Sequence, residues 1–223
     1  MFPAECRPTR RNFLMAGAAF AATLPAAPLL ASPAAPDDSE GSNVIGPRKG
    51  YSPQIGTLVS QMIWMRGVVL DSVKGMGQKE LDFLLDDKAN TIGALLLHLA
   101  ATDRIYQILT FENNPMKDEK DAPADFKQKF AVAMDLGEPA RKSIKGHELD
   151  FYLNTLSEVR EKTFAEFRKR DDKWLATVDK TWGWGPTNNY CKWFHVCEHE
   201  SHHNGQITWI KSRLPDASKS QAR

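Results

Sequence analysis

Apolar residues recur every three to four positions in four separate stretches of this chain, which is the spacing of one face of a helix. The stretches are residues 52–73, 90–113, 148–170 and 189–214. The first begins at Ser52-Pro53, a capping residue followed by a proline in the first turn. Sustained alternation of β-branched and polar residues is absent, so we expect no strands. The pattern predicts an all-α fold, a four-helix bundle.

The connection between the second and third helices is long and charged. It covers about residues 115–147, and a short helix is expected near 124–134. A connection of this length fits a crossover that returns the chain to the other end of the bundle, so that two neighbouring helices run parallel.

A pair of arginines near the N-terminus indicates an export signal. Arg10 and Arg11 precede Phe13-Leu14, an alanine-rich apolar run and a region of small residues. This layout is typical of the twin-arginine export route. The apolar run is interrupted by prolines and is too short to span a bilayer comfortably. We therefore expect a periplasmic or secreted protein.

The expected domain organisation has four parts. They are a twin-arginine signal peptide at 1–35, a Gly/Pro-rich linker at 36–50, the helical bundle at 51–214 and a C-terminal tail at 215–223. The candidate cleavage positions follow Ala31, Ala34 and Ala35.

Charge excludes some classes of partner. The chain has 29 Lys and Arg against 28 Asp and Glu, a net charge of +1. Loss of three arginines and one glutamate with the signal changes this to −1, which gives no electrostatic footprint for nucleic acid. The rest of the chain lacks a second long apolar segment, so we expect no membrane attachment after signal removal.

Four of the six histidines lie within nine residues of the last predicted helix. They are His195, His199, His202 and His203. At about 100° per residue they share one arc with Trp209 and Ile210, whereas Glu200 falls on the opposite side. We therefore expect the histidines to point inward and Glu200 to face solvent.

Two of these histidines have the spacing of metal ligands. His199 and His203 are separated by one helical turn, so both side chains can reach the same cation. His98 lies in the apolar stripe of the second predicted helix. Bundle cores are where metal sites are built from facing helices, and inward histidines on two helices indicate such a site.

The segments "FHVCEHESHHNGQITWIKSRLP" and "NTIGALLLHLAATDRIY" resemble the DinB-like superfamily of metal-binding four-helix bundles. The resemblance covers about residues 51–214. It implies a divalent metal held by the second-helix histidine and by two histidines one turn apart in the last helix. These positions match His98, His199 and His203. His195 and His202 then stand in supporting positions or as substitutes.

Three histidines leave coordination positions open, as in catalytic metal sites. Zinc is the first candidate, and nickel, iron or another divalent metal are alternatives, because imidazole suits all of them. A bound water would be acidified toward neutral pH. The favoured interpretation is an exported metal-dependent hydrolase acting on a small molecule.

Other functions remain open at this point. Relatives that use low-molecular-weight thiols make a thiol-dependent transferase or isomerase an alternative. It ranks lower because such thiols are chiefly cytosolic. A non-enzymatic metal-binding protein is a second alternative, and histidines that support a homodimer interface are a third.

Several further residues have no settled role. Glu198 and Glu200 are candidates for a general base, and Asp103 and Arg104 are expected to be surface or helix-end charges. Trp182 and Trp184 either roof a pocket or pin a loop. Cys191 and Cys197 point apart on one helix, which makes a disulfide between them geometrically poor.

Overall fold

A computed structural model describes residues 43–116 and 119–215. The expected export signal at 1–35, residues 36–42 of the expected linker and all but the first residue of the expected tail lie outside the described residues.

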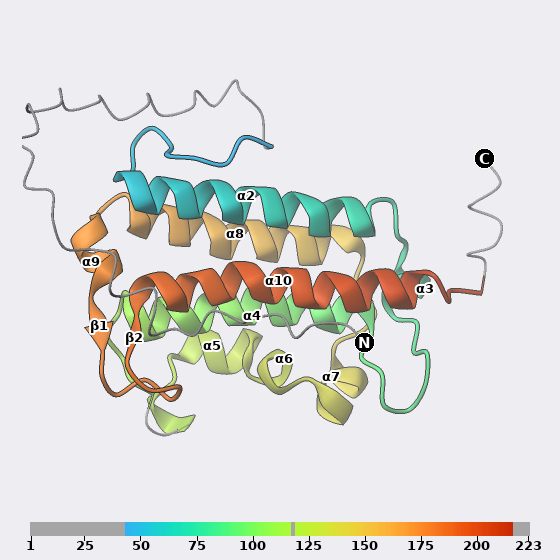
Figure 1. The fold of residues 1–223 in the computed structure, drawn as a ribbon. Coiled ribbons are helices and arrows are strands. Elements are labelled where there is room, and N and C mark those ends of the chain that lie inside the picture. The colour runs from blue at the N-terminus through green and yellow to red at the C-terminus, as the bar shows by residue number, and fades with distance from the viewer. Residues whose placement is uncertain (1–42, 117–118, 216–223) are drawn as a thin grey trace, which may run out of the picture. The chain divides into compact units, whose positions relative to one another are not determined.

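Four long helices form the frame of the molecule (Figure 1), as the sequence predicts. They are α2 (Pro53–Val73), α4 (Ile92–Thr110), α8 (Leu149–Phe167) and α10 (Asn189–Lys211). Side-chain caps fix two of the starts. The Thr91 hydroxyl accepts from the Ala94 amide at 3.1 Å, and the Asn188 side chain accepts from the Cys191 amide at 2.8 Å.

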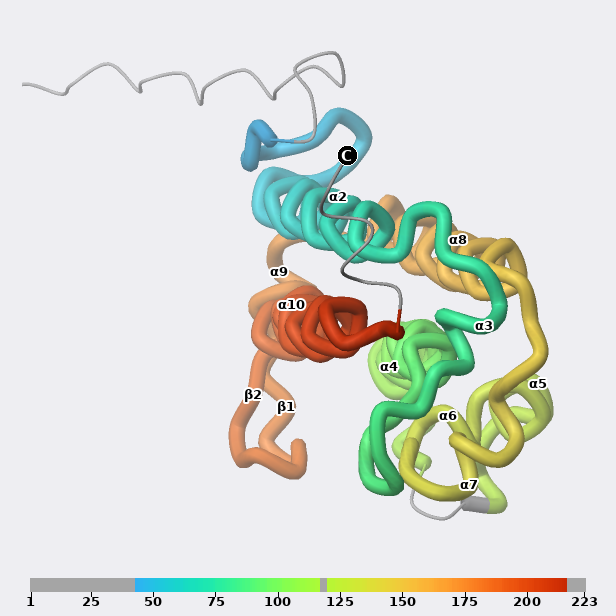
Figure 2. The backbone as a smooth tube through the Cα atoms, turned by 90° about the vertical axis from the view of Figure 1, so that its right-hand side faces the viewer, coloured from blue at the N-terminus to red at the C-terminus, as the bar shows by residue number. Residues whose placement is uncertain are grey.

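The four helices form a ring in which α2 lies beside α10 and α4 beside α8 (Figure 2). Helices α2 and α10 run parallel. Arg66 donates a hydrogen bond to Glu200, and further along both helices Lys211 donates to the Ser72 carbonyl. Helices α4 and α8 are also parallel: Gly93 contacts Tyr152, and Gln107 bonds Thr163. This arrangement needs one crossover, and the structure confirms it between α4 and α8.

Short helices fill the crossover, which lies against the outer side of α4 (Figure 2). They are η2 (Glu119–Asp121), α5 (Ala124–Lys129), α6 (Ala131–Asp135) and α7 (Gly137–Ser143). The single helix expected at 124–134 is divided at Phe130, whose buried ring joins Phe126 and Ala133 in the hydrophobic core. Because α6 covers α4, all but two of the 19 residues of α4 are buried.

Two smaller helices and a hairpin complete the described chain. Helix α3 (Gln78–Leu81) precedes α4, and α9 (Asp172–Ala176) follows α8. Strands β1 (Val178–Asp179) and β2 (Thr187–Asn188) then pair antiparallel and lead into α10. The expectation of no strands was wrong here, because strands of two residues are too short to produce a period-2 pattern.

None of the helices in the described part of the chain combines the length and apolarity that a membrane span requires.

Candidate metal centre

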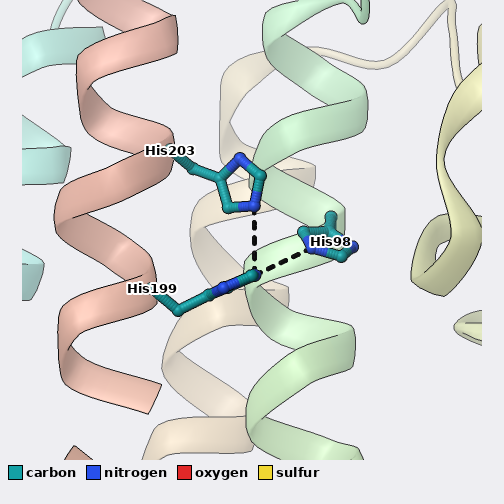
Figure 3. A group of neighbouring side chains, drawn as sticks. All are labelled: His98, His199 and His203. Carbon is teal, nitrogen blue, oxygen red and sulfur yellow. Dashed lines mark hydrogen bonds between the residues drawn. The ribbon is translucent and has the colours of Figure 1, made fainter. Parts of the chain in front are cut away.

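Three histidines from two antiparallel helices converge on one point, and they are the three that the sequence analysis selected (Figure 3). His98 is on α4, and His199 and His203 are one turn apart on α10. The Nε2 atom of His199 lies 2.9 Å from Nε2 of His98 and 3.0 Å from Nε2 of His203. All three rings therefore present the same type of nitrogen to a common centre.

The outer nitrogens of two of these rings have acceptors that fix their orientation. Nδ1–H of His98 donates to the carbonyl oxygen of Ala133 on α6 at 2.8 Å. Nδ1 of His203 lies 2.9 Å from the amide oxygen of Gln206 and donates to it. A proton on Nδ1 leaves the lone pair of Nε2 directed at the shared centre, which is the usual arrangement of metal-binding imidazoles.

Gln206, to which the sequence analysis assigned no role, contacts two of the histidines of α10. Its amide nitrogen lies 3.3 Å from Nε2 of His202, so the exposed His202 supports His203 through Gln206. The spacing of three residues between His203 and Gln206 on a helix was the available signal.

Burial keeps the histidines neutral. Burial, together with the neighbouring histidines, lowers the pKa of His199 to about 3. Burial likewise lowers the pKa of His203 to about 4, although its bond to Gln206 opposes the change. The pKa of His98 is also lowered, mainly by burial. Neutral imidazole is the form that binds a metal.

The spacing of the nitrogens fits a small divalent cation. Zinc–nitrogen bonds of about 2.0–2.1 Å at tetrahedral angles place two imidazole nitrogens roughly 3.3 Å apart. Two of the three nitrogen pairs, at 2.9 and 3.0 Å, are within a few tenths of an ångström of that spacing, and all three ligand atoms lie within 4.8 Å of one another. The three residues therefore fit a divalent metal with at least one position left open.

His195 is outside this trio but lies next to it. Its ring centroid is 5.2 Å from that of His199, and its Nδ1 lies 2.8 Å from the hydroxyl of Tyr106 on α4. Burial raises the pKa of Tyr106, so the hydroxyl stays protonated. Trp184, in the loop between β1 and β2, contacts the His195 ring edge-on.

The expected inner face of α10 was rotated by roughly a quarter turn from the observed one. Glu200 was expected to face solvent, yet it is 1% exposed, whereas Trp209 was expected inside and is 48% exposed. His202 was also expected inside and is exposed, as are Cys191 and Glu198. The metal-site histidines lie at the edge of the buried face, between α10 and α4, rather than at its middle.

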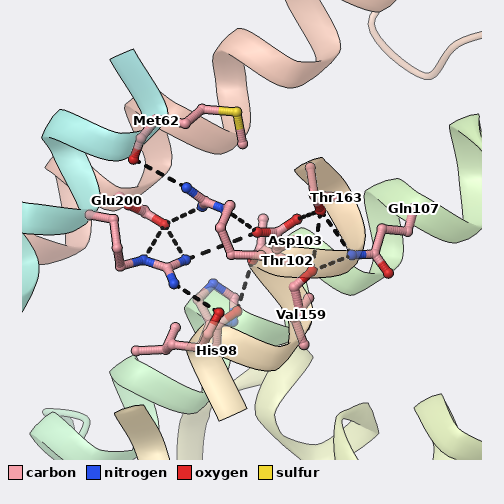
Figure 4. Close-up of polar contacts among 11 residues, drawn as sticks. Met62, His98, Thr102, Asp103, Gln107, Val159, Thr163 and Glu200 are labelled. Carbon is pink, nitrogen blue, oxygen red and sulfur yellow. Dashed lines mark hydrogen bonds and ion pairs between the residues drawn. The ribbon is translucent and has the colours of Figure 1, made fainter. Parts of the chain in front are cut away.

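The middle of that face carries charge (Figure 4). Glu200 Oε1 accepts from Arg66 of α2 at 2.5 Å and from Arg160 of α8 at 2.6 Å. Arg160 also donates to Asp103 of α4 at 2.6 Å. We call Arg66, Asp103, Arg160 and Glu200 the buried charge cluster; it joins all four long helices and its charges sum to zero.

Asp103 and Arg104 were expected at the surface, and this was wrong. Asp103 is 0% exposed and also accepts from the Thr163 hydroxyl at 2.5 Å. Arg104 is buried and pairs with Asp125 of α5 and with Glu112. Both residues are buried because other elements cover almost all of α4, and the sequence of α4 alone does not reveal this.

The comparisons with known proteins agree with this architecture. The family model described as mycothiol-S-transferase matches residues 57–214, most of the chain. A solved structure described as a conserved protein of locus from Enterococcus faecalis is similar in fold, with a TM-score of 0.52 and 15% identity. That match covers 70% of this chain and 93% of the other. No curated protein matches. The resemblance to the DinB-like superfamily predicted from the sequence is confirmed.

Proposed function

Because the chain belongs to the mycothiol-S-transferase family, we propose that it is a metal-dependent transferase that joins a low-molecular-weight thiol to a small electrophile. Membership of the family makes it a transferase-type enzyme. The thiol, the metal and the residues that hold it belong to the proposal. The observation that carries it is the convergence of three neutral imidazoles within a chain of this family.

His98, His199 and His203 would hold the metal, with zinc as the first candidate. A divalent metal in this position would lower the pKa of a coordinated thiol and so supply a thiolate at neutral pH. The protein keeps Nε2 of His98 and His203 available through the bonds of their Nδ1 atoms to Ala133 and Gln206.

The surroundings favour thiol transfer over the hydrolysis that the sequence analysis placed first. Hydrolysis by a metal-activated water usually needs a carboxylate base close to the water. Among the described residues, the group that could hold a metal at this centre consists of histidines only. Glu200 and Asp103 are bonded to arginines in the buried charge cluster. Glu198 and Asp135, whose charge acts on His98, are exposed. A thiol nucleophile has less need of such a base.

A direct assay distinguishes these functions. Zinc-loaded protein purified without a tag would be mixed with 1-chloro-2,4-dinitrobenzene and with mycothiol, glutathione or cysteine in turn. A sulfur–carbon bond forms, chloride leaves with the electron pair of the carbon–chlorine bond, and the thiol proton passes to solvent. We expect zinc-dependent turnover that His98→Ala abolishes.

Two results would assign another function. Cleavage of 4-nitrophenyl acetate without thiol, lost in His98→Ala, would restore the hydrolase. Stoichiometric zinc binding with neither activity would favour a protein that only sequesters metal.

Export remains part of the proposal and rests on the sequence of the N-terminal segment alone. We expect the double variant Arg10→Lys, Arg11→Lys to stay inside the cell with its signal attached. N-terminal sequencing of the exported protein should give a start between about residues 32 and 36. Normal export of the double variant would contradict a twin-arginine signal. The proposal also includes a small-molecule substrate and no nucleic acid or membrane partner. A homodimer is an open alternative.

A further inference from the structure

Four aromatic rings form a continuous group beside the three histidines. Trp184 contacts His195 edge-on, with ring centroids 4.9 Å apart, and Trp182 contacts both Trp184 and Tyr106 at 5.8 Å. His195 in turn contacts His199. We call Tyr106, Trp182, Trp184 and His195 the aromatic wall. It extends from the loop between β1 and β2 to within one helical turn of the candidate metal ligands.

The loop that carries the two tryptophans is fixed to α10. Lys192 is buried and donates to Asp179 of β1 at 2.9 Å, while its ammonium lies 4.1 Å from the ring centroid of Trp182. Asp179 also accepts from the amide and hydroxyl of Thr181. The buried Lys192 thus links α10 to β1 and to Trp182, and these contacts hold the aromatic wall in place.

Trp184 remains 57% exposed despite this anchoring, the highest exposure among the large hydrophobic residues of the described chain. An exposed indole in an anchored loop offers a preformed surface, so the protein loses little conformational entropy when a ligand stacks on it.

Three polar side chains near the wall already have hydrogen-bond partners. The Tyr106 hydroxyl is paired with His195, and the Thr187 hydroxyl donates to the Gly185 carbonyl. The Asn188 side chain caps α10. The rings are therefore the main surface offered to a ligand, which favours a planar, apolar group over a sugar or an ion.

We propose that the aromatic wall binds the electrophilic substrate, and that this substrate carries a planar, electron-poor conjugated group. The inference rests on the proposed function, since it places the electrophile beside the thiol that the metal would hold. The face of an indole ring is electron-rich, so an electron-poor ring stacks on it favourably. Trp184 is then a residue that determines specificity.

The test separates binding from turnover. 2,4-Dinitroaniline is planar and electron-poor but unreactive, so its binding to the zinc-loaded protein, measured by calorimetry, does not depend on any activity. We expect Trp184→Ala to weaken binding about tenfold and Trp184→Phe to weaken it less. Trp209→Ala is the matched control, because Trp209 is similarly exposed on α10 but its contact is with Arg213.

Steady-state kinetics then show which of the two substrates contacts Trp184. Trp184→Ala should raise KM for 1-chloro-2,4-dinitrobenzene while leaving KM for the thiol and the rate with iodoacetamide, which has no ring, unchanged. Equal binding of the probe by wild type and Trp184→Ala would overturn the inference, as would a rise in the thiol KM alone. Probe binding that depends on Trp184 in a protein without transferase activity would retain the planar-ligand site and reject only the proposed function.

Discussion

Two of the three imidazoles of the candidate metal centre are oriented by a neighbour on their outer side. A backbone carbonyl of the crossover serves His98, and the side chain of Gln206 serves His203. Metal binding should thus depend on residues that do not touch the metal as well as on the three histidines. Substitutions of the two kinds should reduce metal affinity to different extents.

We expect His98→Ala, His199→Ala or His203→Ala to reduce zinc affinity by far more than 100-fold, because each removes a bond to the metal. Gln206→Ala should reduce it by about 10–100-fold, since it removes only the orienting acceptor. Competition with a chromophoric zinc chelator measures both.

His195→Ala and His202→Ala are the controls for these variants and should retain much more affinity than any of the three. Loss of binding in His195→Ala together with full binding in His203→Ala would mean that His195 and His199 are the ligand pair instead.

At the scale of the helices, the buried charge cluster is the feature on which the packing depends. Its carboxylates and guanidiniums come from four different helices and are all almost fully buried. Removing one charge from such a set leaves the opposite charges in the core without compensation.

We expect Glu200→Ala to lower the free energy of unfolding by about 3–5 kcal/mol, because Arg66 and Arg160 then share Asp103 alone. Urea unfolding of the metal-free protein followed by circular dichroism gives this value. Glu198→Ala, two positions away and exposed, should change it by less than about 0.5 kcal/mol. Equal effects of the two substitutions would rule out the cluster as a stabilising unit.

A second prediction concerns the contact between α4 and α8. A Cβ at Gly93 would lie 2.5 Å from the hydroxyl oxygen of Tyr152, whose side chain is fully buried. Gly93→Ala should therefore lower the free energy of unfolding by about 1–3 kcal/mol in the same urea assay.

Gly67→Ala in α2 is the matched control, since nothing lies within 4 Å of its Cβ position. It should raise the free energy of unfolding by about 0.5–1 kcal/mol through helix propensity. A stable Gly93→Ala protein would show that the two helices can separate at this point without cost.

The sequence predicted the elements better than the faces they bury. Helical spacing located all four long helices and the crossover, and the turn between His199 and His203 located the candidate site. The buried face of α10 was missed because polar and charged residues occupy much of it, so an apolar pattern points elsewhere. Glu200 looks like a surface residue until the arginines of two other helices are placed beside it.

At the scale of the whole molecule, a bound metal would link α4 to α10 and stabilise the fold by mass action. Free zinc at about 100 times its dissociation constant should add about 2.7 kcal/mol, a rise in Tm of roughly 5–10 °C. Differential scanning fluorimetry with zinc and after chelation checks this. His203→Ala should have the same Tm in both conditions, and a zinc-dependent Tm in that variant would contradict the site.

The parallel pairing of α2 with α10 also determines when the domain can form. Its first and last long helices are neighbours, so the contacts between them have a long sequence separation, which slows folding relative to a bundle of successive hairpins. During synthesis α2 keeps its apolar side uncovered until the ribosome has released nearly the entire chain. The final helix that covers α2 also brings His199 and His203, so completion of the hydrophobic core and assembly of the three histidines are a single late event.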